Sequence, residues 1–224
     1  MEPLLAFGAA LVAFRLAGAL ARRWRERGAP ELGAWAASLL AYSLASGALA
    51  WGAAAGWNEA AFRVYYVCGG LLTAALLGAG SLLLVRRRWA GPLALVYVGF
   101  AVGIGLTEPL TAPLEGTSIP EAQEHLDFLP ARLVAVIANS LGTLAVVTIA
   151  LLTIRRRPLG NALILAGVTA AAAGSAVAGL GVAQTSLFVA LGAVLLYFGF
   201  LAGRKDSVRN RLSRQRPRLA SHAE

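Results

Sequence analysis

The chain is short of the residues that most cofactor and cross-link chemistry requires. Its 224 residues include one cysteine, Cys68, one lysine, Lys205, and two histidines, His125 and His222. A single cysteine excludes an internal disulfide, and the two histidines do not provide a pair of intramembrane haem ligands. The sequence therefore predicts no metal site, no cofactor and no catalytic residues, and we expect the protein not to be an enzyme.

Charge is also scarce. Only 14% of the residues are charged while 58% are hydrophobic, and the mean hydropathy is +0.68. Soluble domains are roughly 45–50% apolar and about 25% charged. Since a transmembrane helix needs about 20 residues, this composition predicts an all-α integral membrane bundle. Its expected partner is the lipid bilayer, and nucleic-acid binding is not expected despite the net charge of +9.

Long apolar stretches predict a seven-helix transmembrane domain over residues 1–203 and a basic tail over 204–224. The first stretch is interpreted as a retained span, because the segment before it carries an acid where a signal peptide carries bases. Spans one to three and five to seven share a rhythm that is compatible with a weak 3+1+3 organisation. The predicted spans are Pro3–Ala21, Leu32–Ala55, Arg63–Val85, Pro92–Leu110, Ala131–Ile154, Asn161–Val182 and Ser186–Ala202.

The basic residues lie on alternate connectors. Of the 20 lysines and arginines, 17 follow spans one, three, five and seven, whereas most acids lie on the other connectors. Because cytoplasmic loops are enriched in basic residues, the N-terminus is predicted to lie outside and the C-terminus in the cytoplasm, in the cytoplasmic (inner) membrane. The basic tail is predicted either to lie on anionic lipid or to be a disordered anchor.

Small residues recur every four positions in the sixth predicted span, at Gly167, Ala171, Ser175 and Gly179. Residues four apart share one face of a helix, and small side chains there let two helix backbones approach closely. We expect these residues to pack against other helices of the same chain. Contacts with a second copy in a homo-oligomer, or with a membrane partner, are the alternative.

Glu108 is the most informative acid, because it lies near the outer end of the fourth predicted span. Ionisable groups at membrane depth are costly and often functional. Its expected partners are Arg132 and Arg63, and together they predict a charged outer vestibule. The alternative is that these groups lie in the headgroup zone, with the tyrosines in an aromatic belt. The remaining predicted vestibule residues are Glu59, Asp127, Tyr65 and Tyr66.

Uncharged polar residues within the spans form a second candidate set. Side chains of this kind either line an interior site or form hydrogen bonds between helices. The set comprises Asn139, Ser140, Thr143, Tyr42 and Ser46.

Two functions fit these features. The topology favours transport of a small solute or lipid, or a channel, through the vestibule near Glu108. The alternative is a non-enzymatic membrane scaffold or sensor subunit that binds a partner through its small-residue faces and basic tail. The absence of lysine from the seventh predicted span contradicts a retinal protein of the microbial rhodopsin type.

Three segments together resemble a family of uncharacterised small bacterial multi-pass membrane proteins. The resemblance implies a seven-span fold and no known activity. The segments are Trp57…Phe62-Arg63-Val64-Tyr65-Tyr66…Gly69, Leu129-Pro130…Asn139-Ser140-Leu141-Gly142-Thr143 and Gly199-Phe200-Leu201-Ala202.

Overall fold

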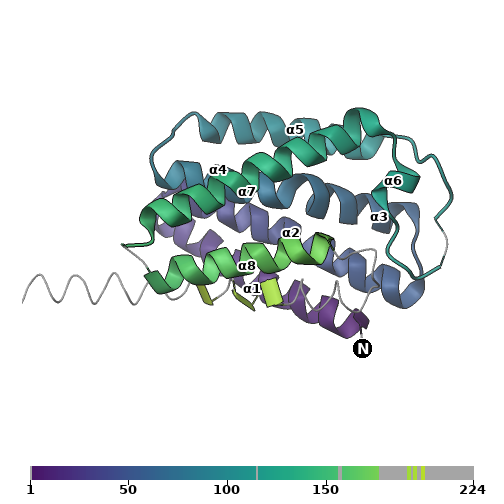
Figure 1. Ribbon diagram of the computed structural model, residues 1–224, viewed down its shortest axis with the longest axis horizontal. Coiled ribbons are helices and arrows are strands. Elements are labelled where there is room, and N and C mark those ends of the chain that lie inside the picture. Colours follow the sequence, from purple (N-terminus) through teal and green to yellow (C-terminus); the bar gives the residue numbers. More distant parts are fainter. Residues whose placement is uncertain are drawn as a thin grey trace, which may run out of the picture.

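The computed structural model describes residues 2–114, 116–155 and 158–176 and positions 191–192, 194–195 and 198–199. Within these residues the regular structure is helical and contains no strand. The long helices run side by side along one axis of the molecule (Figure 1). The predicted all-α class is therefore confirmed for the described part of the chain.

The first two helices form a hairpin. α1 (Glu2–Arg27) runs past the predicted end of the first span and stops at Gly28, whose φ of 62° favours glycine. α2 (Pro30–Ala55) begins at a proline, which has no N–H to leave unbonded in the first turn. It ends where the Gly56 N–H donates to the Gly52 carbonyl at 3.0 Å.

The third span is one apolar stretch, Glu59–Leu84, built from three helical segments. α3 (Glu59–Tyr65) is capped by Asn58, whose side-chain oxygen accepts a hydrogen bond from the Ala61 N–H at 2.9 Å. It continues into a π-helix, η1 (Tyr66–Leu72), and then into α4 (Thr73–Leu84). A π segment widens the helix by one residue and leaves backbone carbonyls in need of other donors.

The remaining helices complete the bundle. α5 (Ala90–Thr107) is followed by a long connector that holds the short α6 (Ala122–His125). The chain re-enters the bundle through η2 (Phe128–Arg132) and α7 (Leu133–Thr153), and then turns back into α8 (Pro158–Ala176).

Five helices are long and apolar enough to cross a membrane: Pro3–Arg27, Pro30–Ala55, Glu59–Leu84, Ala90–Thr107 and Phe128–Thr153. These coincide with the first five predicted spans and support a multi-pass membrane protein. The sixth predicted span overlaps α8, of which Pro158–Ala170 is a shorter apolar helix. Most of the seventh predicted span and all of the basic tail lie outside the described residues, so seven spans and the 3+1+3 organisation stay predictions.

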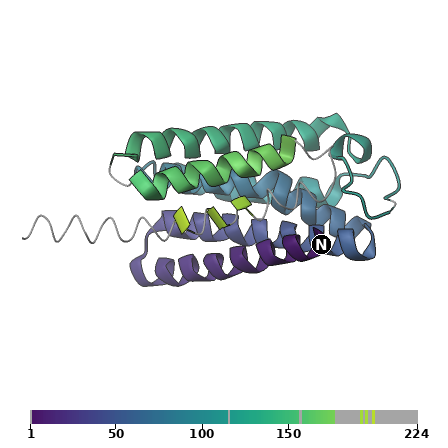
Figure 2. The same cartoon turned by 60° about the horizontal axis from the view of Figure 1, so that its bottom comes forward.

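α2 and α4 lie at the centre of the described contacts: α1 packs on α2, α2 on α4, and α4 on α7. Figure 2 shows α7 and α8 together on the side of the bundle opposite α1. α4 and α7 approach closely at two glycines, since a Cβ on Gly78 would lie 2.7 Å from the Cα of Gly142. In the predicted packing series, Gly167 is buried, while the side chains of Ala171 and Ser175 and all of Gly179 lie outside the described residues.

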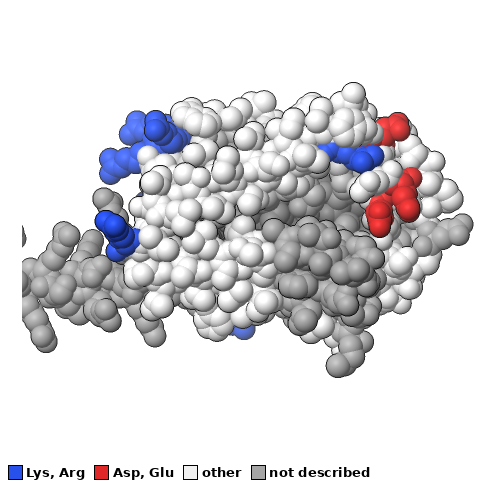
Figure 3. Space-filling model, in the orientation of Figure 1, with Lys and Arg blue, Asp and Glu red and all other residues white. Residues whose placement is uncertain are grey.

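Charge is divided between the two ends of the bundle. Arg86, Arg87 and Arg88 lie in the turn between α4 and α5, at what we call the basic end. The acids Glu59, Glu121, Glu124 and Asp127 lie at the opposite, acidic end. Figure 3 shows basic side chains gathered at one end and acids at the other, where one basic group lies beside them. Large apolar side chains face outward between the ends, among them Leu95 and Leu106 on α5. Such a surface is compatible with lipid contact; the orientation in the membrane stays a prediction.

Candidate functional site

The predicted vestibule residues lie at the acidic end, where α3, η1, α5 and η2 meet. Arg63 on α3 pairs with Glu59, with 2.8 Å between Nη2 and Oε1. Its Nη1 also donates to the Gly105 carbonyl at 2.7 Å. That carbonyl lacks its usual helical partner because the residue four positions on is Pro109, which has no N–H. Arg63 therefore ties α3 to the end of α5.

Glu108 lies immediately after the last residue of α5, although the sequence placed it within a longer span. Its N–H still donates to the Ile104 carbonyl at 2.8 Å, but its backbone is extended, with a ψ of 124°. Extended backbone is the preferred conformation before a proline, here Pro109. The Glu108 side chain is only 8% exposed. The residue is thus largely covered by protein, while its depth in the membrane stays a prediction.

The Glu108 side chain lines a pocket of about 10 Å³, the size of about one water molecule. Among the described residues its carboxylate makes no hydrogen bond and no ion pair. Arg63 is paired with Glu59, and Arg132 lies over the Phe128 ring at 5.6 Å. The other lining residues are Phe62, Arg63, Tyr66, Ile104, Gly105, Leu110, Leu126 and Ala131.

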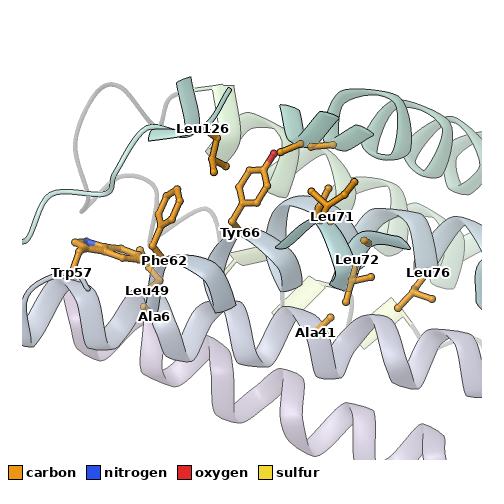
Figure 4. Close-up of a cluster of buried hydrophobic side chains, with 14 of the residues drawn as sticks. Ala6, Ala41, Leu49, Trp57, Phe62, Tyr66, Leu71, Leu72, Leu76 and Leu126 are labelled. Atoms are coloured by element: carbon orange, nitrogen blue, oxygen red, sulfur yellow. The ribbon is translucent and has the colours of Figure 1, made fainter. Parts of the chain in front are cut away.

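Tyr66 contributes an unsatisfied hydroxyl to this pocket. The residue is 8% exposed, and its hydroxyl is buried with no hydrogen-bond partner in the described part of the chain. Figure 4 shows its ring between Leu126 and Leu71, with the hydroxyl directed away from α2. The ring stacks on Phe62 with 6.1 Å between centroids. Glu108 and Arg132 both lie within electrostatic range of the hydroxyl.

Tyr65 and Asp127 lie apart from the Glu108 pocket. The Tyr65 ring meets Trp57 edge to face, with 5.4 Å between centroids, and lies within electrostatic range of Tyr42. Successive residues of a helix point about 100° apart, so of the two tyrosines only Tyr66 lines the pocket. Asp127 is exposed to solvent. The predicted vestibule residues therefore divide into a buried group around Glu108 and a peripheral group.

A larger pocket, of about 560 Å³, opens at the acidic end. It is formed by the start of α3 and the first part of the long connector, and Leu110 lines both this pocket and the small one. The Trp57 indole is 6% exposed, and its N–H has no hydrogen-bond partner within the described ranges. The lining residues are Trp57, Asn58, Glu59, Leu110, Thr111, Ala112, Pro113 and Leu114.

His125, which sequence reasoning did not select, is a buried residue of α6 at the acidic end. It is 8% exposed, and its ring lies 5.7 Å from that of Phe62. Its Nδ1 lies 3.0 Å from the Glu121 carbonyl, and its own carbonyl accepts from the Thr111 N–H at 3.0 Å. These bonds hold α6 against the connector. Its place between Glu124 and Leu126, in a largely polar segment, was not enough to predict burial.

Of the predicted interior polar residues, Asn139 has a clear structural role. Its side-chain amide on α7 donates to the Gly70 carbonyl of η1 at 2.7 Å. The Tyr97 hydroxyl on α5 similarly donates to the Leu71 carbonyl at 2.9 Å. Carbonyls released by the π segment are thus satisfied by two other helices.

The rest of that set does not converge on one site. Tyr42 and Ser46 are buried in α2, Thr143 is half-buried in α7, and Ser140 is exposed. The residues described contain no group of three or more histidines, cysteines or acids arranged to hold a metal ion.

Comparison with known proteins shows that no family model, curated protein or solved structure matches the chain. The resemblance of the three sequence segments to small bacterial multi-pass proteins therefore stays a prediction, and function is argued from the site.

Proposed function

We propose that the protein is a transporter or channel for a small solute and that its external opening is the 560 Å³ pocket at the acidic end. The positive-inside rule supports this orientation, because the basic connectors lie at the opposite end in the structure. The main support is Glu108: the residue is 8% exposed, forms no ion pair with the described residues, and lines the small pocket that shares Leu110 with this opening.

Buried polar groups without partners destabilise the folded state, so they are retained mainly where they serve a function. Burying an unpaired charge or an unbonded hydroxyl raises the free energy of the folded state. A helix bundle with a purely structural role would gain stability by replacing Tyr66, whose buried hydroxyl has no partner among the described residues, with phenylalanine. Ionisable residues at membrane depth accordingly mark pathways for ions and substrates more often than structural contacts.

The neighbouring π segment supports passage beyond the opening. The 10 Å³ pocket is too small for a solute, so a pathway requires the surrounding helices to move apart. η1 starts at Tyr66, and its Gly70 and Leu71 carbonyls are held by side chains from α7 and α5. π segments recur at functional sites, and here one joins the pocket to two helices that must separate.

Solute entry into proteoliposomes tests the proposal. Osmotic swelling is followed for a neutral, a zwitterionic and a cationic solute: glycerol, glycine and choline. We expect faster swelling than in empty vesicles for at least one solute. Leu110→Trp should reduce that rate several-fold, because Leu110 lines both pockets.

Leu95→Trp is the matched control, since Leu95 is 76% exposed on the outer face of α5. This variant should swell like the unaltered protein. Swelling no faster than in empty vesicles for all three solutes would count against transport and favour the scaffold or sensor alternative. If Leu110→Trp and Leu95→Trp reduced the swelling rate equally, the reduction would not arise at the pocket.

A further inference from the structure

One face of α1 is exposed along most of the helix and changes from apolar to basic. The residues of this face recur at intervals of three or four, which places them in one row on the helix surface. The other side of α1 packs on α2. We call the exposed row the α1 stripe, and it consists of Leu4, Gly8, Leu11, Arg15, Gly18 and Arg22.

Arg15 is exposed within a helix that is long and apolar enough to cross a membrane. It forms no ion pair in the described part of the chain. On α1 the nearest acids are Glu2 and Glu26, each more than about 15 Å from Arg15 along the helix axis. The neighbouring α2 has no charged residue after Glu31. Because an arginine at membrane depth is costly without a partner, its counter-ion is to be sought outside the described protein.

Arg15 and Arg22 lie on either side of Gly18. They are about 10 Å apart along the helix axis, and arginine side chains are long enough to reach along a helix surface to a group placed between them. Gly18 leaves that position open, since no atom lies within 4 Å of an added Cβ. Two guanidinium groups beside an open position supply the paired N–H donors that phosphate oxygens accept.

The part of the α1 stripe before Arg15 is apolar. Leu4 and Leu11 are exposed, and a Cβ added to Gly8 would meet no atom within 4 Å. This part is about 16 Å long, while the hydrocarbon of one leaflet is about 15 Å thick. The stripe therefore offers a surface as long as one acyl chain, directly beside a cationic position of phosphate size.

We propose that the α1 stripe binds one anionic phospholipid from the leaflet at the basic end. The lipid phosphate lies between Arg15 and Arg22, and an acyl chain lies along Gly8 and Leu11. α1 runs from the acidic end to the basic end (Figure 1), so the headgroup faces the basic end. Charge complementarity favours this occupant over a second copy of the chain. Two copies meeting at this face in one membrane would run parallel and bring their arginines together.

Photochemical labelling in bilayers tests and locates the site. The full chain is reconstituted in dioleoylphosphatidylcholine vesicles with a trace of phosphatidylglycerol or of phosphatidylcholine, each carrying the same diazirine in an acyl chain. After illumination, the labelled peptides are identified by mass spectrometry. We expect the α1 peptide that contains Leu4 and Leu11 to be labelled several-fold more by the phosphatidylglycerol probe. An excess of unlabelled phosphatidylglycerol should reduce this labelling.

Arg15→Gln should lower the preference for phosphatidylglycerol about fivefold, because one basic residue contributes about that factor to the attraction of anionic lipid. Arg88→Gln is the matched control: it also removes one exposed arginine from the basic end, but in the turn between α4 and α5. This variant should keep the preference. Gly18→Leu fills the position between the two arginines without a change of charge, and it should lower the preference as well.

The preference is measured first in the unaltered protein, so it does not depend on the folding of any variant. Equal labelling of α1 by the two probes would overturn the proposal, and so would a preference that Arg15→Gln leaves intact. A preference confined to peptides other than those of α1 would place the lipid elsewhere and also overturn it. Loss of the preference in the presence of inorganic phosphate would show a site for free phosphate instead of a lipid. None of these results depends on solute transport.

Discussion

The two halves of the third span are packed by opposite means. Around α4 the contact is made by small residues, with Gly78 lying against the backbone of Gly142 on α7. Around η1 it is made by polar side chains, with Asn139 and Tyr97 bonded to backbone carbonyls. One half depends on close backbone contact, and the other on hydrogen bonds to an irregular backbone.

The difference indicates which half is built to move. Backbones in contact at glycines cannot separate slightly without losing most of their dispersion energy, because that attraction falls steeply with distance. Hydrogen bonds to a π segment can be exchanged for bonds to water. The unsatisfied Tyr66 hydroxyl and the pocket lined by Glu108 also lie beside the polar half. We therefore expect α4 and α7 to act as a fixed seam and the acidic-end half to rearrange.

The strongest test of the fixed seam is Gly142→Ala. An added Cβ at this position would overlap the Ala74 carbonyl of α4. Backbone atoms of α4 cannot turn aside as a side chain can, so the overlap is removed only if α4 and α7 move apart. We expect a loss of about 1–3 kcal/mol in the free energy of unfolding. The measurement is denaturation in mixed detergent micelles.

Gly99→Ala is the control for this substitution. Gly99 lies on α5 with no atom within 4 Å of its added Cβ. Alanine is favoured over glycine within a helix by roughly 0.5–1 kcal/mol, so this variant should be unchanged or more stable. Equal stability of the two variants would mean that the seam is not close-packed.

The polar half is tested by Asn139→Ala. The substitution removes the Asn139 donor to the half-buried Gly70 carbonyl. Interhelical hydrogen bonds in membrane proteins contribute about 0.6–2 kcal/mol, so the loss should be smaller than at Gly142. Ser140→Ala, at the next and exposed position, should change stability little. A loss at Asn139 larger than that at Gly142 would reverse the comparison of the two halves.

The helical architecture follows largely from composition. Apolar runs of membrane-spanning length located the first five spans, and arginine clusters marked alternate connectors between them. The glycine contact at Gly78 was also indicated, because small residues recur four positions apart in that span. The Glu59–Arg63 pair follows from spacing, since residues four apart on a helix are neighbours.

The interior of the site was less predictable. The hydrophobic pattern through η1 does not distinguish a π segment from an α-helix. The Gly69-Gly70 pair is the one irregular feature of that stretch, and it does not by itself predict a π segment. The inward direction of Glu108 depends on tertiary packing against Phe62 and Tyr66. Sequence reasoning also grouped Tyr65 with Glu108 in one vestibule, whereas in the structure the Tyr65 ring meets Trp57.

Tyr66→Phe tests the role of the unpartnered Tyr66 hydroxyl. Removing a buried hydroxyl that has no partner should leave the free energy of unfolding unchanged or raise it by up to about 1 kcal/mol. Solute entry in the swelling assay should nevertheless fall, if the hydroxyl serves the pathway. Tyr97→Phe is the matched control, because its hydroxyl is bonded to the Leu71 carbonyl and its loss should destabilise. Destabilisation by Tyr66→Phe as large as that by Tyr97→Phe would mean that the Tyr66 hydroxyl has a partner after all.

The smallest effect is expected from Glu59→Gln. Glu59 is 64% exposed in its side chain, and exposed ion pairs contribute little, so the loss should be below about 0.5 kcal/mol. Arg63→Gln should cost more, because Arg63 also supplies the only described donor to the Gly105 carbonyl, whose helical partner would be Pro109. Measuring both variants separates the ion pair from the tie between α3 and α5. If the two losses were equal, the hydrogen bond from Arg63 to the Gly105 carbonyl would contribute nothing to stability. The polar contacts between the acidic-end half and its neighbouring helices would then be those of Asn139 and Tyr97.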